Sequence, residues 1–532
     1  MKNLTKNLEN LISILITLIF FTYIFLFFFF FFRGGYLDPM LPLEAREYAS
    51  TSSILAFANN QNPFSFEEFP INVNAYSALW PFLLGNICKL FQIHNAHQII
   101  IFSRVVSLIF FFLGIYFFYL YYRKKIPLNL LFFLLIFFII STTLKISLGT
   151  WSTGAGLVLY FIAILISFEA QSRKNYLVSA FLFLIAAHLK IYFILGFLIL
   201  TFNYINFFFR KKYLLCNALI ALFLIIMISV HYYYFPTYYF ISILNQINIT
   251  NFSNFNTFNF ILSKKLYSEL FFLIKNYFYL LLIFFYFLFL YLKTVKLLNF
   301  LFVIKLSFIV FFIYLVIFKL WPNFGNFGTY SNNLIIPVLI AFVIKLYSFI
   351  KNKKTIKKNL NFFFTIVIIF PISTNIFNWN YPGVLKSIDI ESNHKNFNII
   401  KKILNNNENV YFDHYLGSFN NHKIGKILYF NGNADHIFTS SINNFTNYLI
   451  INFFQTDRIY YNYKKNYQVG IKEINHKYNF LICSFVCFNL SNSNNNSDFF
   501  GIYSKYSYKE INSLKIINLF GQEYFVKIIK LN

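Results

Sequence analysis

Acidic side chains gather in one polar segment, residues 33–81, of a chain that is otherwise mostly apolar or basic. The segment contains Asp38, Glu44 and Glu47, followed by Glu67 and Glu68, whereas the whole chain has 18 Asp and Glu residues. A carboxylate within reach of a reacting hydroxyl group can accept its proton, so this cluster indicates general base chemistry. Glu44 is the first candidate for the base, and Asp38 and Glu47 are the reserves.

Glu44 also has a purely structural interpretation, which its spacing alone favours. Pro42 suits the first position of a helix, because its missing N–H would have no partner there. Glu44 then falls in the first turn, where acidic residues are common because the helix dipole favours negative charge. Glu44, Glu47 and Tyr48 share one helix face, so we expect a short helix lying on the membrane surface.

Two cations are candidates for binding an anionic leaving group. Arg104 and Lys190 fall near the outer ends of their expected spans, and a leaving phosphate needs cations or N–H donors where its charge develops. Either side chain would also be explained by a cation that extends to the membrane interface to keep its charge in water.

Four further residues complete the candidate substrate-binding set. His188 lies two positions before Lys190, where a packing or hydrogen-bonding role competes with a functional one. Tyr48, Tyr76 and Tyr330 also suit interfacial anchors, which membrane proteins use freely. No residue is assigned as a metal ligand, and no cofactor is expected.

Composition identifies the kind of scaffold that must position these residues. The chain of 532 residues is 58% hydrophobic, with 79 Phe and 40 Tyr, above the roughly 45–50% apolar content of ordinary domains. Apolar runs longer than about 18 residues indicate membrane spans. The formal charge of +27 comes from bases between those runs, so no nucleic-acid partner is expected. Four cysteines are too few for a disulfide framework.

About eleven spans are expected, and several are close to the short limit. They cover residues 11–32, 99–122, 128–148, 154–168, 176–187, 191–209, 213–230, 277–292, 300–320, 334–350 and 362–372. The first run is longer than a signal-peptide core and no cleavage pattern follows, so it is read as a retained span. With a cytoplasmic N-terminus, the basic clusters after the inward spans all lie inside, as the positive-inside rule requires.

The chain divides into a transmembrane part, residues 1–374, and a tail, residues 375–532. The tail segments NVYFDHYLG, GKILYFNG and NYLIINFF are typical of short strands between turns. We expect a small extracytoplasmic α/β domain there. Cys483 and Cys487 have no second pair to complete a metal site, and whether they form a disulfide is open.

Several motifs together resemble the GT-C class of membrane glycosyltransferases, close to the protein O-mannosyltransferase and aminoarabinose transferase group (glycosyltransferase family 39). EAREYA at 44–49 is similar to the family's acidic motif before Tyr-Ala, and YSALWP at 76–81 to its Tyr and Pro entry into a helix. The segments around Arg104 and Lys190 resemble the second span and a later helix pair, and 330–337 a late loop.

The resemblance implies a multi-pass enzyme of the plasma (inner) membrane that works on the cell envelope. It would transfer a sugar from a polyprenyl-phosphate carrier to a lipid, glycan or protein hydroxyl at the outer face. Glu44 stands where most members have Asp, Ala45 where many have Glu, and Ser152 near the position of another acid. Direct displacement would invert the anomeric centre, as in base-assisted glycosidases.

Other functions remain alternatives at this point. A transporter or flippase of lipid-linked sugars usually shows internal repeats and broken helices near the midplane, and none is evident here. A polysaccharide polymerase or ligase of another membrane family would carry its main polar loop late in the chain. A scaffold that displays the tail is the non-enzymatic alternative.

Overall fold

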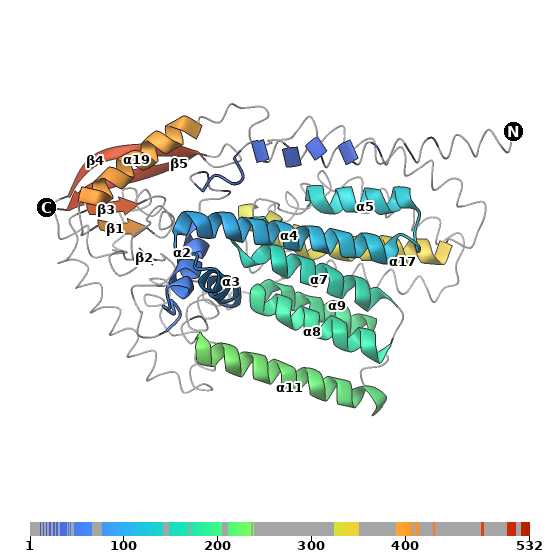
Figure 1. Ribbon diagram of the computed structural model, residues 1–532. Helices are drawn as coiled ribbons and strands as arrows, with labels where there is room; N and C mark the ends of the chain where they lie inside the picture. Colours follow the sequence, from blue (N-terminus) through green and yellow to red (C-terminus); the bar gives the residue numbers. More distant parts are fainter. Residues whose placement is uncertain are drawn as a thin grey trace, which may run out of the picture.

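The computed structural model describes part of the chain, which Figure 1 draws as coloured ribbon. The described residues are scattered positions between 11 and 33, positions 41, 43 and 238, and the ranges 35–39, 47–65, 77–141, 148–169, 172–204, 211–235, 324–350, 390–406, 410–413, 429–430, 480–483, 508–517 and 523–531. The expected spans at 277–292, 300–320 and 362–372 lie outside these residues, as do Glu44 and Tyr76.

The described part of the chain is mostly helical. Its elements are α2 (Glu47–Ala58), α3 (Leu79–Leu90), α4 (Ala96–Tyr122), α5 (Leu128–Ser141), α7 (Ser152–Phe168), α8 (Arg173–Leu189), the 3₁₀ turn η1 (Ile191–Leu195), α9 (Gly196–Asn203), α11 (Lys211–Tyr234), α17 (Phe324–Ile350), α19 (Ile390–Asn406), and strands β1 (Val410–Asp413), β2 (Tyr429–Phe430), β3 (Phe480–Cys483), β4 (Tyr508–Ile517) and β5 (Glu523–Leu531).

Helix α7 lies at the centre of the bundle, packed against α4, α8 and α17 (Figure 1). Its first turn and a half consists of small residues, Ser, Thr, Gly, Ala and Gly at 152–156, which let neighbouring helices approach closely. Gly114 of α4 is equally tight, because a Cβ there would lie 2.7 Å from Val158 Cγ1. Nearly all side chains of α7 are buried, as expected of a helix that is apolar on every side.

Stacked aromatic rings fill the space between α4, α5 and α7. The rings of Phe138 and Phe161 stack with centroids 4.4 Å apart. Phe111 stacks on Phe138 at 5.9 Å, and Phe118 contacts Phe161 at 5.2 Å. Rings at these separations add to the stabilisation that their burial provides. The high Phe content of the sequence is therefore used directly in packing.

Helix ends follow the local sequence. Asn95 caps α4, since its side chain accepts a hydrogen bond from the His97 N–H at 2.8 Å, and α4 therefore begins three residues before the expected position 99. Ser172 caps α8 by accepting from the Asn175 N–H at 3.1 Å. The break that the sequence predicts near His188 and Lys190 is confirmed, because α8 ends at Leu189 and a 3₁₀ turn begins at Ile191.

Two expected elements differ from the structure. Helix α5 ends at Ser141, and Leu148 is not helical although the expected span reached it. The described part of the helix expected around position 44 begins at Glu47 and continues to Ala58. Every α2 side chain that the structure describes is buried, so α2 packs within the protein, and its expected position at a membrane surface stays a prediction.

Two of the described helices are long and apolar enough to cross a membrane, within Ala96–Tyr122 (α4) and Tyr213–Tyr234 (α11). Among the residues whose side chains are described, four further apolar helical stretches are shorter than 18 residues: Leu79–Leu90, Ser152–Phe168, Ile191–Asn203 and Asn333–Lys345. The number of eleven spans stays a prediction, because three of them lie outside the described residues.

The described strands of the tail form one mixed sheet with the order β2-β1-β3-β5-β4. Strand β1 pairs in parallel with β2 and β3, whereas β5 is antiparallel to β3 and β4. Helix α19 packs against β4 (Figure 1), and the Asn396 side chain donates to the Lys515 carbonyl at 2.7 Å. Strands β1 and β2 lie in segments predicted as strands; the third predicted strand, NYLIINFF, and Cys487 lie outside the described residues.

Substitution of Gly85 by Ala tests the close contact between α2 and α3. An added Cβ would lie 2.8 Å from the carbonyl oxygen of Ile54 and against the Cβ of Phe57. A backbone oxygen cannot rotate away, so we expect Gly85→Ala to lower the free energy of unfolding by about 1–3 kcal/mol. Thermal unfolding of the purified protein measures this. Leu90→Ala, at an α3 position that is 81% exposed, is the control, and an equal Tm for both variants would contradict the packing.

Candidate functional site

Arg104 is a buried cation at the point where the first polar segment meets the bundle. It lies in α4, and its side chain is 0% exposed, as is that of its partner Glu47. An uncompensated charge in such a place is strongly destabilising, so the contacts of Arg104 decide what it does. We call Arg104 and the residues in hydrogen-bond contact with it or with Glu47 the Arg104 cluster: Tyr36, Asp38, Leu41, Leu43, Glu47, Arg104 and Thr150.

The guanidinium group uses all of its donors within the cluster. Its Nε and Nη2 donate to the two carboxylate oxygens of Glu47 at 2.9 and 2.7 Å. Its Nη1 donates to the carbonyl oxygens of Tyr36 and Asp38, and its Nη2 also to that of Leu41 at 2.9 Å. Since a guanidinium group has five N–H donors, these five contacts account for all of them. Arg104 thus holds the backbone at Tyr36, Asp38 and Leu41 in place.

The carboxylate of Glu47 is engaged to the same degree. Besides the two donors of Arg104, it accepts a hydrogen bond from the Leu43 N–H at 2.8 Å and one from the Thr150 N–H at 3.3 Å. A bidentate Arg–carboxylate pair whose other lone pairs are satisfied is the form in which two charges tolerate burial. Glu47 therefore joins three parts of the chain: the first segment, α4 and the loop before α7.

The loop before α7 is tied down by side chains from three helices. Ser107 of α4 donates to the Gly149 carbonyl at 2.7 Å. Ser50 of α2 and the indole N–H of Trp80 in α3 both donate to the Thr150 carbonyl, at 3.0 and 3.2 Å. These contacts hold the non-helical backbone at 148–150, where the expected span 128–148 ends.

Tyr36 closes the cluster from the other side. Its hydroxyl lies 2.8 Å from the carbonyl oxygens of Arg104 and Leu148, both acceptors for its one proton. Burial raises the pKa of Tyr36 above its ordinary value. The hydroxyl therefore stays neutral and acts as a donor to backbone, not as a proton-transfer group.

Lys190 lies beside this cluster, at the junction between α8 and η1. Its Nζ is 5.9 Å from the ring centroid of Trp151, the residue that follows Thr150. The residue is partly exposed, unlike Arg104. One loop thus connects the buried Glu47 carboxylate to a cation that solvent or a ligand can reach.

His188 makes packing contacts. Its Nδ1 is 2.9 Å from the Leu184 carbonyl oxygen, and its ring lies 5.4 Å from that of His231 in α11. Its own carbonyl accepts from the Ser77 hydroxyl at 3.4 Å. These contacts agree with the structural interpretation of His188, and its substrate-binding role stays a prediction.

The tail reaches the same region through Asp38. The Nε2 of His394, in α19, lies 2.9 Å from Oδ2 of Asp38, while the Asp38 carbonyl accepts from Arg104. The Asp38 side chain is 21% exposed. Of the predicted acids that the structure describes, Asp38 is therefore the accessible one and Glu47 the buried one.

The structure brings together some of the residues that the sequence singled out. Asp38, Glu47 and Arg104 meet directly, and Lys190 lies beside the loop that Glu47 holds. Glu44 and Tyr76 lie outside the described residues. Tyr48 falls within α2 and Tyr330 within α17.

Sequence reasoning missed several participants: Tyr36, Thr150, His231 and His394. Tyr36 and Thr150 lie just after the ends of expected spans, among turn residues. That position could have identified them as candidates for the site. His394 is far away in the sequence, and no local pattern connects it to Asp38. Among the described residues, no group of three or more His, Cys, Asp and Glu side chains is arranged to hold a metal ion.

The charged residues of this region have two different roles, because some fix the backbone and others are exposed enough to meet a substrate. Glu47 and Arg104 neutralise and satisfy each other, so neither is poised to take up a proton or to bind a phosphate in this conformation. Leu43 and Glu47 are both fixed by the same hydrogen bond, and Glu44 follows Leu43 directly in the chain. Of the residues that the structure describes here, Asp38 and Lys190 are the partly exposed charged ones.

A set of substitutions tests the buried pair. Arg104→Met leaves the Glu47 carboxylate buried without its cation, so we expect a loss of about 3–5 kcal/mol of unfolding free energy. Adding Glu47→Gln removes the uncompensated charge and should recover part of that loss. Lys125→Met, which breaks a partly exposed ion pair with Glu169, is the matched control and should cost about 0–1 kcal/mol. Chemical unfolding measures all three, and equal losses for the two single variants would contradict the role given to Arg104.

No protein-family model, curated protein or solved structure matches this chain. The resemblance to GT-C enzymes therefore rests on the sequence motifs. A function has to be argued from the contacts described above and from the chemistry that those residues allow.

Proposed function

We propose that the protein is a multi-pass membrane glycosyltransferase of the GT-C kind. It transfers a sugar from a polyprenyl-phosphate carrier to an acceptor hydroxyl at the outer face of the plasma membrane. The proposed topology has about eleven spans, a cytoplasmic N-terminus and an extracytoplasmic α/β tail. The site lies between the first outer segment and the outer ends of the helices that carry Arg104 and Lys190.

The exposed side of α11 supports a membrane location. Only 11% of its most apolar window is buried. Leu215 is 70% exposed, Ile225 60% and Leu222 54%. A continuous apolar surface of this kind is unfavourable in water and suits contact with lipid chains.

The distribution of polar groups over the bundle supports the proposed topology. The ends of α4, α7 and α17 that carry Lys125, Glu169 and Lys345 meet at one end. The Arg104 cluster, Lys190 and His188 lie at the opposite end of the bundle, towards the start of α4 and α7 and the end of α8. Basic residues after the inward helices thus gather on one side, as the positive-inside rule expects.

One observation carries the functional part: the acidic first segment is fixed beside the two predicted cations. Glu47 binds Arg104 directly, and through Thr150 and Trp151 the same loop reaches Lys190. A transferase for a lipid-phosphate sugar needs a carboxylate and a cation within one small region, and a rigid anchor that keeps them there.

In the proposed reaction, Glu44 accepts the proton of the acceptor hydroxyl as its oxygen attacks the anomeric carbon. The bond from that carbon to the phosphate oxygen breaks, and the leaving phosphate keeps its electron pair. Lys190 stabilises the developing phosphate charge. Arg104 and Glu47 are positioning residues that fix the segment before α2. Asp38 is the reserve for the base, because it is accessible and held by the same anchor.

Removal of the Glu44 carboxylate tests the base. Glu44→Gln is expected to lower the transfer rate by about 10²–10⁴-fold, the usual contribution of a general base. The assay follows loss of the sugar from polyprenyl-phosphate hexose and pentose donors by purified protein in lipid nanodiscs. Glu67→Gln, in the same segment, is the charge-matched control and should keep its activity.

Two outcomes would contradict the role of Glu44. Unchanged transfer by Glu44→Gln assigns the base elsewhere, with Asp38→Asn as the next variant. Movement of labelled carrier across the bilayer without loss of sugar favours a flippase instead. Binding of the donor by Glu44→Gln, measured in parallel, separates a chemical defect from a folding defect.

Lys190 generates a second prediction. Lys190→Gln should weaken donor binding and transition-state stabilisation together, lowering kcat/KM by at least about tenfold, because a charge-assisted hydrogen bond contributes ~1.5–3 kcal/mol. Lys190→Arg keeps the charge and should retain a larger share of activity. Lys89→Gln, on an exposed position of α3, controls for the loss of one positive charge. If Lys190→Gln and Lys89→Gln have equal kcat/KM, Lys190 does not contact the phosphate.

A further inference from the structure

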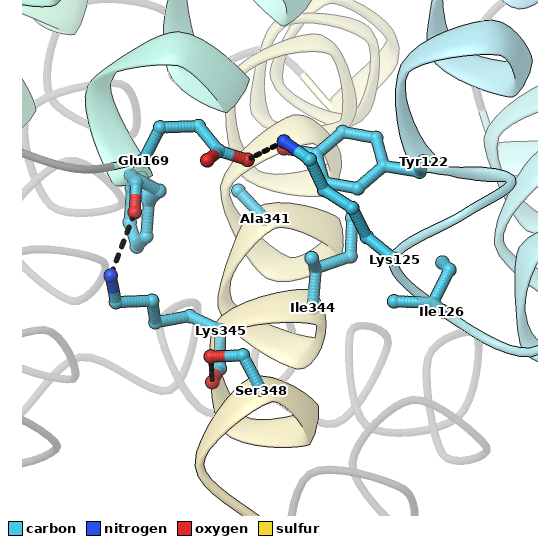
Figure 2. A pocket seen from close by; sticks show the side chains of 9 residues that line it. Tyr122, Lys125, Ile126, Glu169, Ala341, Ile344, Lys345 and Ser348 are labelled. Atoms are coloured by element: carbon cyan, nitrogen blue, oxygen red, sulfur yellow. Dashed lines mark hydrogen bonds and ion pairs between the residues drawn. The ribbon is translucent and has the colours of Figure 1, made fainter. Parts of the chain in front are cut away.

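A cavity of about 150 Å³ lies at the end of the bundle opposite the Arg104 cluster, between α4, α7 and α17. Figure 2 shows its lining side chains. It is lined by Tyr122, Lys125, Ile126, Phe168, Glu169, Ala341, Ile344, Lys345 and Ser348. In the topology proposed above, this end faces the cytoplasm, and the inference below rests on that membrane-spanning arrangement but not on sugar transfer.

Two lysines border the cavity, one just after α4 and one in α17 (Figure 2). Lys125 follows α4, and its Nζ is 3.0 Å from Oε1 of Glu169 and 3.6 Å from the ring centroid of Tyr121. Lys345 of α17 donates to the Phe168 carbonyl at 3.0 Å. Glu169 is the one acid in the lining, so the lining carries one net positive charge.

More positive charge lies next to the cavity in the sequence. Arg123 and Lys124 immediately precede Lys125, and Arg173 and Lys174 begin α8; all four side chains are exposed. A concave site with cations both in its lining and close by attracts anions, and the potential is strongest where low-dielectric walls focus it.

Structural roles account for part of this arrangement. Lys345 binds a carbonyl at the C-terminal end of α7, where cations are favourable. The ion pair of Lys125 with Glu169 is 42% and 24% exposed on its two sides, and pairs of that kind contribute about 0–1 kcal/mol. Because this ion pair is weak, Lys125 can also bind a second anion at little cost in free energy. The ion pair does not account for the cavity itself.

We propose that this cavity binds the phosphate group of an anionic phospholipid of the inner leaflet. Lys125 and Lys345 donate to the phosphate oxygens from two sides. Ile126, Ala341 and Ile344 form the apolar wall beside the glycerol part of the lipid. Basic pockets between spans on the cytoplasmic side recognise such head groups by this combination of charge and apolar wall. The bound lipid would join the inner ends of α4 and α17.

Lipid binding by the full-length protein tests this. Native mass spectrometry and thermal shift in neutral detergent would be measured with added phosphatidylglycerol, with phosphatidylcholine and with inorganic phosphate. Wild type should bind phosphatidylglycerol in preference to the other two and gain Tm with it. The double variant Lys125→Gln/Lys345→Gln keeps side-chain donors without charge and should bind at least about tenfold more weakly, from the loss of charge-assisted hydrogen bonds.

Lys124→Gln is the matched control, since it removes one charge next to the cavity from a residue that does not line it. It should stay within about twofold of wild type, because an exposed charge outside the contact contributes little. An equal loss of lipid binding in Lys124→Gln and in the double variant would show that general surface charge, and not this cavity, attracts the lipid. Binding of inorganic phosphate without phosphatidylglycerol would overturn the lipid assignment, as would unchanged binding by the double variant. Glu44→Gln should bind the lipid normally, so failure of either proposal is distinguishable from failure of the other.

Discussion

A buried ion pair between Arg104 and Glu47 is the constraint on which the arrangement of the first polar segment depends. Two charges at 0% exposure are tolerated because every guanidinium donor and each carboxylate oxygen has a partner. The same contacts that satisfy the charges hold the backbone at Tyr36, Asp38, Leu41 and Leu43, and at Thr150 before α7. Removing either member would therefore disturb two segments that are about 100 residues apart in the chain. In the proposed enzyme, this anchor places a reactive carboxylate without taking part in its chemistry.

The two ends of the helical bundle use charge in different ways. At one end, the ion pair of Arg104 and Glu47 is fully buried and hydrogen-bonded, which makes it rigid and leaves the pair itself out of reach of ligands. At the other end, Lys125 and Lys345 border a cavity and are partly exposed. Exposed pairs exchange partners easily because water and protein compete for them on similar terms. The Arg104–Glu47 pair is thus suited to positioning, and the cavity beside Lys125 and Lys345 to reversible binding.

Much of the helical part follows from local sequence. Apolar runs bounded by Asn95 and Ser172 give α4 and α8, and the polar pair His188 and Lys190 marks the break before η1. Local signals fail where contacts from distant segments decide. Leu148 is apolar and was expected to be helical. Instead, hydrogen bonds from side chains of three helices hold the backbone beside it in a non-helical conformation. Strands β3, β4 and β5 were not predicted, although β5, EYFVKIIKL, is rich in the aromatic and β-branched residues that favour strands.

The sequence by itself determined that the chain is rich in apolar helices and where most of those helices lie, and it singled out Glu44 first, with Asp38, Glu47, Arg104 and Lys190, as candidate polar residues. Periodicity, helix caps and charges next to apolar runs are local properties, so they can be recognised from the sequence alone. The tertiary structure decided which of these charged side chains are buried in an ion pair and which are partly exposed. Glu47 is fully buried against Arg104, while Asp38, paired with His394, and Lys190, beside Trp151, are partly exposed. That difference depends on burial and on partners contributed by other helices, and neither is encoded in the neighbours of a residue along the chain.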